Sequence, residues 1–207
     1  VYEATAKFQR DRDLAPMVWG RAGWTGSQRH PIQWGGDPQS DWEGLAASIR
    51  GGLSWGMSGV PYHSSDIGGF YGSQQPTAEL YLRWLQATVF SSHIRVHGIG
   101  EREPWAYGPE IEAICRKWLA FRYRLIPYLE SVIAIATRTG LPVMRAMPLA
   151  FPGNPLLRNY ETQFMCGDAL LVAPVIQPGG EVEIALPPGA WYDLISRQRF
   201  PGQRVLR

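Results

Sequence analysis

Trp34-Gly35-Gly36-Asp37 is the stretch that decides the fold, because it closes the apolar run at residues 31–34 with a turn and an acid. Two glycines let the backbone turn where a side chain would clash. The carboxylate is then presented at a strand end, on a loop held by a rigid scaffold, where binding and catalytic groups are common. The alternative is a tight turn whose aspartate caps the next helix.

Three other short runs end in the same way, with a polar side chain beside a glycine turn. They are residues 16–21, 60–66 and 90–97, and the polar groups at the four ends are Arg21, Asp37, Asp66 and His97. Helical patterns alternate with the runs, which predicts a parallel sheet, either doubly wound or closed into a barrel. In a barrel, the four polar ends would converge on one mouth.

A helix is predicted before the first run, at residues 2–13, and two more lie between later runs, at residues 40–57 and 77–89. Ser40, with Glu43 three residues later, resembles a capping box. Gly51 and Gly52 cost about 1 kcal/mol each relative to alanine inside a helix, so we expect close packing against a sheet there. The second helix places one apolar stripe on its inner face, made of Leu45, Ile49, Leu53 and Met57.

The pattern changes after residue 109. Residues 110–139 predict a long helix that Pro127 should kink or split. A strand is predicted at 143–151, and short β-type runs bounded by Pro-Gly turns follow, which indicates an antiparallel domain from about residue 165. The chain therefore divides into a βα part over residues 1–140 and a part with β-type runs over residues 141–207.

Composition limits the class of protein. Of 207 residues, 45% are hydrophobic and 18% charged, as in globular chains, and the net charge of +2 gives no reason to expect nucleic acid or an anionic membrane as a partner. Cys115 and Cys166 have no metal-type spacing. The chain opens abruptly at Val1 without a signal peptide, so we expect a piece of a longer polypeptide. The sequence leaves the compartment undetermined, with the cytoplasm slightly favoured, and does not determine the oligomeric state.

The available chemistry suits sugars. His93 and His97 need not share a face, no HExxH or GxSxG motif is present, and Gly98-Ile99-Gly100 lacks the rest of a dinucleotide fingerprint. We therefore expect no metal and no cofactor. Carboxylates that accept hydrogen bonds from hydroxyls, an arginine and a histidine that donate, and aromatic rings suit an oligosaccharide partner.

The ordered motifs resemble glycoside hydrolase family 31, the retaining α-glycosidases that include α-glucosidases and α-xylosidases. The resemblance covers nearly the whole chain. It implies the C-terminal half of a TIM (β/α)8 barrel followed by the beginning of an antiparallel β-sandwich domain. The motifs are Arg21, Trp34-Gly35-Gly36-Asp37, Arg50-Gly51-Gly52-Leu53-Ser54, Ser65-Asp66-Ile67-Gly68-Gly69-Phe70, Arg83-Trp84, Arg95-Val96-His97, Pro127-Tyr128-Leu129, Arg145-Ala146-Met147 and Gly167-Asp168-Ala169-Leu170-Leu171-Val172-Ala173-Pro174.

The resemblance implies roles for five residues. Asp37 matches the general acid/base, and Arg21 resembles the arginine that bonds sugar hydroxyls. Asp66 and His97 match residues that hold hydroxyls of the same sugar, and Trp34 corresponds to an aromatic wall. The family's nucleophile is an aspartate on an earlier strand, which no aspartate of this chain matches, so the remainder of the polypeptide would supply it along with the missing barrel half.

The resemblance also implies the reaction, which is the release of terminal α-linked glycosyl residues from oligosaccharides by a double displacement. Residues 91–97 and 104–107 resemble the α-xylosidase branch more than the maltase branch. A transglycosylase or lyase, and a non-catalytic carbohydrate-binding or scaffold protein, are the alternatives. For Arg21, Asp66 and His97 the alternative is a structural role. We expect His93 to be structural and Asp41 to be a helix-start charge. A second set of residues could either line a sugar subsite or pack in the core or at the rim: Tyr62, His63, Trp105 and Tyr107.

Overall fold

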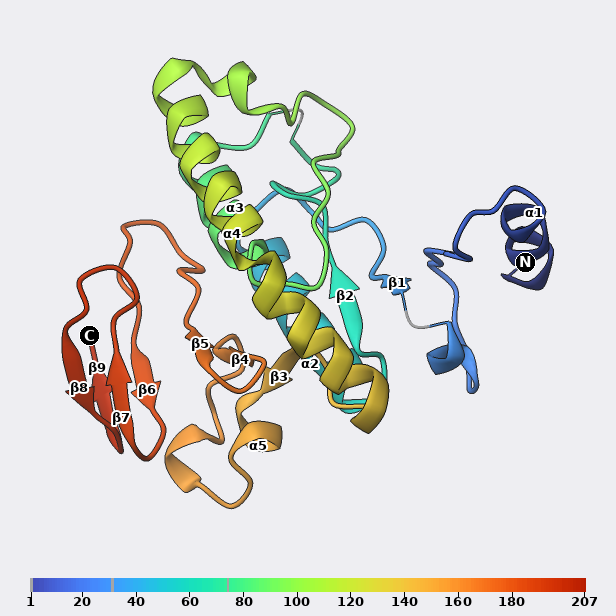
Figure 1. Ribbon diagram of the computed structural model, residues 1–207. Helices are drawn as coiled ribbons and strands as arrows, with labels where there is room; N and C mark the ends of the chain where they lie inside the picture. The colour runs from blue at the N-terminus through green and yellow to red at the C-terminus, as the bar shows by residue number, and fades with distance from the viewer. Residues whose placement is uncertain (1, 31, 74) are drawn as a thin grey trace.

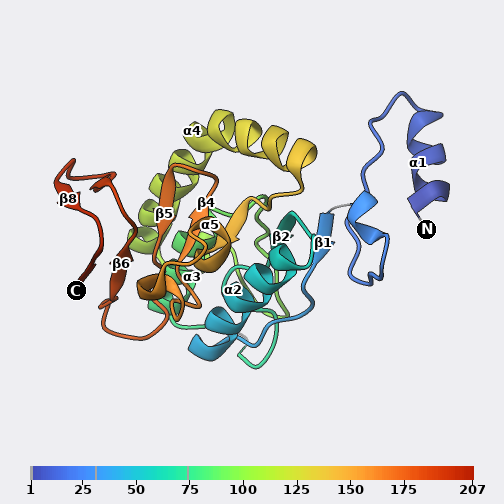
Figure 2. The ribbon, with the colours of Figure 1, turned by 90° about the horizontal axis from the view of Figure 1, so that it is seen from below.

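The computed structural model describes residues 2–30, 32–73 and 75–207. Helix α1, Tyr2–Arg10, stands apart from the rest of the chain, and the C-terminal strands lie at the opposite end of the molecule (Figure 1, Figure 2). The predicted helix at 2–13 therefore ends three residues early. Asp13 has a positive φ of 55°, and Leu14 N bonds back to Gln9 O, which closes the turn.

Two of the four predicted parallel runs form strands. Strand β1, Ile32–Trp34, pairs in parallel with β2, Tyr62–Ser64, with Gln33 opposite His63. Residue 31, the first of its run, lies outside the described residues. The four runs still lie side by side in chain order, because isolated parallel bridges join the outer two runs to this pair, at Gly20↔Gln33 and Asp66↔Arg95.

The predictions of full strands at 16–21 and 90–97 were wrong. In the fourth run the hydroxyl of Ser91 donates to the carbonyls of Thr88 and His93, and that of Ser92 donates to the carbonyl of His63. Such local side-chain bonds compete with ladder pairing. Each outer run therefore contributes a single bridge.

Helix α2 spans Trp42–Met57 and starts at Asp41, whose carboxylate accepts from Gly44 N at 2.7 Å. The predicted capping box at Ser40 was wrong, because the Ser40 hydroxyl accepts a hydrogen bond from Arg102 Nη2 at 3.0 Å. The residue just before the helix is Asp41, so its carboxylate takes the capping position, and the prediction of a helix-start charge there is confirmed.

The inner stripe of α2 is confirmed for Leu45, Ile49 and Leu53, which are buried, whereas Met57 is exposed. The two adjacent glycines differ. A methyl group at Gly52 would overlap the ring of His63, so the helix lies directly on the β2 side chain there. A methyl group at Gly51 would meet nothing within 4 Å, so the prediction of close packing holds for Gly52 only.

Helices α3, Ala78–Thr88, and α4, Pro109–Thr139, pack together over the sheet. Thr77 caps α3, whose buried residues include Leu80, Trp84, Ala87 and Thr88. Pro127 does not split α4, which is continuous through it. One core cluster joins α2, α3, α4 and the first C-terminal strands.

The C-terminal part pairs antiparallel throughout, as predicted. β3, Met144–Ala146, β4, Phe164–Cys166, and β5, Leu170–Val172, form one sheet. β6, Ile184–Leu186, pairs with β9, Arg204–Leu206, and β7, Ala190–Tyr192, pairs with β8, Arg199–Pro201. The strand predicted at 143–151 is half wrong, because α5, Met147–Ala150, follows β3 directly. Short 3-10 turns occupy Ser27–Arg29, Pro104–Tyr107 and Pro155–Leu157.

Candidate active site

Asp37 lies three residues beyond the end of β1, on the turn that Gly35 and Gly36 make possible. Gly36 has a φ of 96°, and a methyl group at Gly35 would lie 2.7 Å from Nε2 of His63. Any side chain at Gly35 would therefore displace the buried ring below it. Because Asp41 caps α2, the carboxylate of Asp37 has no capping role and is presented at the strand end.

Arg21 reaches Asp37 from the neighbouring run. Its Nη1 donates to Asp37 Oδ2 at 3.3 Å, and the two side chains are 64% and 35% exposed. An ion pair this exposed contributes little to stability. Both groups therefore keep most of their hydrogen-bonding capacity for a ligand.

Asp66 is placed differently. Its side chain is 0% exposed, and its two oxygens accept from Arg95 Nε at 2.6 Å and Arg95 Nη2 at 3.0 Å. Burial raises the pKa of Asp66, and the charge of Asp37 raises it further, while Arg95 and His97 oppose this. Phe70, four residues after Asp66, joins the other strand ends. Its N–H donates to Pro38 O at 2.7 Å and its ring lies 5.5 Å from that of His97, while Arg21 is bonded to Asp37.

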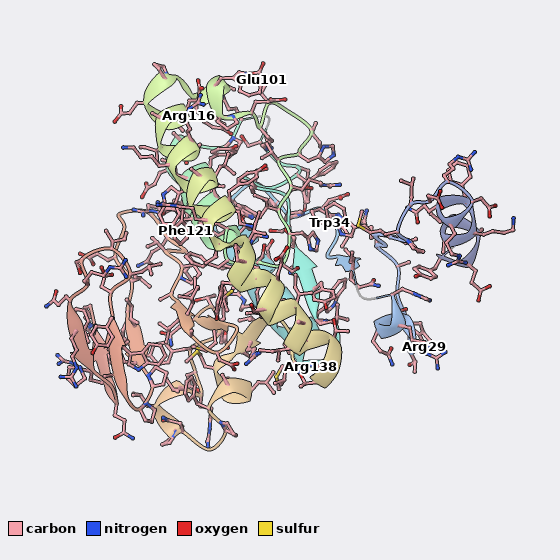
Figure 3. All side chains as sticks on the ribbon, in the orientation of Figure 1. Arg29, Trp34, Glu101, Arg116, Phe121 and Arg138 are labelled. Atoms are coloured by element: carbon pink, nitrogen blue, oxygen red, sulfur yellow. The ribbon has the colours of Figure 1, made fainter. Side chains whose placement is uncertain are left out.

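Trp34 is the last residue of β1 and is 7% exposed. Figure 3 shows it on the side of the molecule that faces the N-terminal segment. The Arg95 guanidinium carbon lies 4.1 Å from the centroid of its ring, and Trp19 meets it edge-on at 5.1 Å. The ring is thus clamped between a cation and a second indole, with only a small part left for a ligand.

His97 is exposed at the end of the fourth run, and its ring lies 5.5 Å from that of Phe70. Phe70 belongs to the Gly68-Gly69-Phe70 motif, but the sequence had suggested no role for it. A large ring directly after two glycines at a strand end was the signal available. Phe70 orients the histidine from the neighbouring loop.

Arg102 joins the loops around the site and was not predicted. It is 2% exposed, and it donates to Gly69 O from Nε and to Ser40 Oγ and Ser73 O from Nη2. One buried guanidinium therefore ties the loop after Asp37 to the loop after Asp66. No periodicity or spacing in the sequence distinguishes this arginine from the charged residues beside it.

A cleft of about 400 Å³ opens beside Asp37 and runs along α2. Its lining includes acids and aromatic rings: Asp37, Asp41, Glu43, Trp55, His63 and Tyr71. Acids that accept hydrogen bonds from hydroxyls, together with planar rings, suit a sugar chain. Tyr71 was missed by sequence reasoning, although it directly follows Phe70.

The other histidines and aromatic residues considered from the sequence either pack against the rest of the protein or lie on its surface. Burial lowers the pKa of His63 and of His93 to about 4, so both rings are neutral at physiological pH. Tyr107 stacks on Tyr81 at 4.4 Å, which places it in the core, whereas Trp105 is exposed.

No group of three or more His, Cys, Asp or Glu side chains in the described part of the chain could hold a metal ion. Across residues 2–30, 32–73 and 75–207, no helix is both long and apolar enough to span a bilayer.

Two family descriptions match the chain. The glycosyl hydrolases family 31 TIM-barrel domain matches residues 1–132. The chain belongs to glycoside hydrolase family 31. The family 31 C-terminal domain matches residues 140–206, so the fold is the family's TIM-barrel domain followed by its C-terminal domain.

Curated members of family 31 resemble the chain over most of its length. The α-xylosidase of Saccharolobus solfataricus is 33% identical across 100% of the chain and 29% of the relative. An α-xylosidase of Emericella nidulans is 40% identical across 83% of the chain and 22% of the relative. Human neutral α-glucosidase AB is 36% identical across 100% of the chain and 23% of the relative. The chain thus spans less than a third of each of these relatives.

Solved family 31 structures share the fold. The cycloalternan-degrading enzyme of Trueperella pyogenes superposes with a TM-score of 0.93 at 32% identity, covering 99% of this chain and 31% of that one. A family 31 α-xylosidase from a soil metagenome, solved with xylose, gives 0.91 at 32% identity, covering 99% and 34%. The agreement extends over both the parallel and the antiparallel part.

Proposed function

We propose that this chain carries the acid/base half of a retaining α-glycosidase, which releases terminal α-linked glycosyl residues from oligosaccharides. The observation that carries the proposal is the presentation of Asp37 on a glycine turn at a strand end, with Arg21 beside it, in a member of family 31. The names α-xylosidase and α-glucosidase among the relatives support this reaction class. Residues 91–97 and 104–107 favour the α-xyloside.

The reaction follows from two carboxyl groups. Retaining glycosidases hold them about 5–5.5 Å apart. A nucleophilic aspartate from an upstream segment would attack the anomeric carbon, while Asp37 donates a proton to the leaving oxygen. Asp37 would then take a proton from water as that water displaces the nucleophile. The negative charge of the nucleophile would favour the protonated form of Asp37 that the first step needs.

The other exposed groups hold the sugar. Arg21 and His97 would donate hydrogen bonds to its hydroxyls, and Trp34 would meet it along the part of its ring that stays accessible. Contacts that strengthen in the oxocarbenium-like transition state increase kcat. The predicted contact between Asp66 and a hydroxyl stays a prediction, which its buried carboxylate and its two bonds to Arg95 do not support.

The architecture is part of the proposal. Residues 1–140 would form the second half of a (β/α)8 barrel, and residues 141–207 would form the barrel exit and the start of the β-sandwich. The parallel order of the four runs supports this arrangement. The other barrel half, from the same polypeptide, would cover the open sheet edges and supply the nucleophile.

The test uses the full-length polypeptide with Asp37→Ala. We expect at least about a 100-fold loss of kcat/KM on an unactivated oligosaccharide, because general acid catalysis contributes about 10²–10⁴-fold. An aryl α-glycoside with a good leaving group needs less protonation, so its loss should be smaller. Added azide should restore turnover by displacing the enzyme carboxylate, which yields an α-glycosyl azide.

Glu112→Ala is the matched control, since it removes a carboxylate on α4 that pairs with Arg116 and does not line the cleft. It should leave kcat/KM unchanged. Full activity of Asp37→Ala on the oligosaccharide would refute the acid/base role. A wild-type protein that binds oligosaccharide without cleaving or transferring it would favour the non-catalytic alternative. Transfer or elimination products would favour the transglycosylase or the lyase.

A further inference from the structure

Asp66 and Arg95 form an ion pair in which the carboxylate is fully buried and the arginine side chain is 32% exposed. Both carboxylate oxygens are engaged, one by Nε and one by Nη2, so the two planar groups meet edge to edge. Charge-assisted bidentate pairs of this kind are strong and fix orientation. With 0% of its side chain exposed, Asp66 has no surface through which a ligand could reach it.

The backbone repeats the connection made by the side chains. Asp66 and Arg95 face each other in a parallel bridge, and Ile67 N donates to Arg95 O at 3.0 Å. Among the described residues the fourth run forms no ladder beyond this bridge, and the hydroxyl of Ser92, which donates to the carbonyl of His63, adds a second bond to the β2 segment. His97 follows Arg95 by two residues, so the contacts of Arg95 with Asp66 also restrict where His97 lies.

The pair also acts on β1. The guanidinium that bonds Asp66 lies 4.1 Å from the ring centroid of Trp34, and Trp34 precedes Asp37 by three residues. The guanidinium, whose orientation the Asp66 carboxylate fixes, lies over one face of the Trp34 ring, and Trp19 contacts the Trp34 ring edge-on. The carboxylate thus bonds the edge of the guanidinium, and the guanidinium lies over the indole ring.

From this arrangement we propose that Asp66 and Arg95 are positioning residues. The pair orients Trp34 and His97 against the sugar, and Asp66 itself does not touch the substrate. The proposal rests on the proposed function for its kinetic consequences. Its structural part, the dependence of Trp34 on the Arg95–Asp66 pair, stands independently.

The kinetic test compares Asp66→Asn, Arg95→Met and the double variant in the full-length polypeptide. Each single change should lower kcat on an α-xyloside about 10–100-fold with KM within about 3-fold, since the interactions lost are those made in the transition state. The double variant should be no worse than the poorer single variant, because both changes break one unit. Arg95→Lys should not rescue, since lysine keeps the charge but lacks the planar fork.

Direct contact between Asp66 and the sugar predicts other results. Asp66→Asn would raise KM more than Arg95→Met does, the two effects would multiply in the double variant, and the Asp66→Asn penalty would disappear on a deoxy substrate lacking the contacted hydroxyl. Any of these outcomes overturns the proposal.

A spectroscopic test works even for variants too weak to assay or a protein without glycosidase activity. Arg95→Lys and Arg95→Met should change the near-ultraviolet circular dichroism of the folded protein. The change should be much smaller in a Trp34→Phe background, where Trp19, whose ring centroid lies 5.3 Å from the Arg95 guanidinium carbon, still contributes. An unchanged spectrum in folded Arg95→Met overturns the proposal. Absence of glycosidase activity in the wild type would refute the proposed function alone.

Discussion

The loops after β1 and β2 each combine an aspartate with two glycines, but in opposite order. Gly35-Gly36-Asp37 places glycines before the acid, and Asp66-Ile67-Gly68-Gly69 places them after it. Glycines before the acid carry the chain around the turn first, so Asp37 emerges with 35% of its side chain exposed. Asp66 comes before its turn, still in line with the sheet, and is fully buried. In these two loops, the acid that follows the glycine turn is exposed to solvent, and the acid that precedes it is buried in an ion pair.

The largest expected effect is on stability. Asp66→Ala leaves the half-buried Arg95 without its partner. The cost should exceed about 1 kcal/mol but stay below the cost of breaking a fully buried pair, about 3–5 kcal/mol, because Arg95 is 32% exposed and water reaches it. Asp37→Ala breaks an exposed pair worth at most about 1 kcal/mol. Urea unfolding of the full-length polypeptide measures both. Equal losses would mean that the two loops do not differ in the way their burial indicates.

The histidines under the loops give a pH dependence of known sign. Burial lowers the pKa of His63 and of His93 to about 4, while the unfolded chain keeps values near 6.5. The unfolded state therefore binds more protons between these values. Each histidine contributes up to about 3 kcal/mol that is fully present above about pH 6.5 and is lost as the pH falls toward 4.

Asp66 acts in the opposite direction. Burial raises its pKa, so the native state binds the extra proton and the contribution of Asp66 to stability falls as the pH rises between its unfolded and folded values. Urea unfolding at about pH 7.5 and about pH 5 should show a net loss in acid, since two histidines titrate across that window. His63→Gln should remove a substantial part of the loss. An equal slope in wild type and variant would contradict the assignment.

Substitutions of the adjacent glycines Gly51 and Gly52 in α2 test whether the His63 ring supports the turn before Asp37. Gly52→Ala forces the added methyl group into the ring of His63, which itself supports Gly35, and overpacking of this kind costs about 1–3 kcal/mol. Gly51→Ala has open space and should stabilise by up to about 1 kcal/mol through helix propensity. Gly52→Ala should also lower kcat by displacing the turn, whereas Gly51→Ala should not. Thermal unfolding and kcat together distinguish them.

Sequence reasoning predicted the parallel order of the four runs and the glycine turns at their ends, because short apolar runs and glycines are local signals, but only two of the four runs form strands. It did not predict which acids would be buried. The Asp66–Arg95 pair spans 29 residues and the bonds of Arg102 reach from Ser40 to Ser73, so neither contact leaves a periodic signal. The same limit explains the cap of α2. Ser40 matches a capping motif locally, but a distant arginine takes its hydroxyl.

The smallest expected effect concerns the exposed pair itself. Arg21→Gln should change the free energy of unfolding by about 0.2–1 kcal/mol, and about 1 M salt should remove most of that difference, because the Debye length falls to about 3 Å. The Arg95→Met loss should stay nearly constant in salt, since Arg95 bonds a carboxylate that solvent does not reach. Urea unfolding at about 0.05 M and 1 M sodium chloride measures both. A salt-insensitive Arg21 would mean that Asp37 is held as firmly as Asp66, leaving it less free to move protons on a substrate.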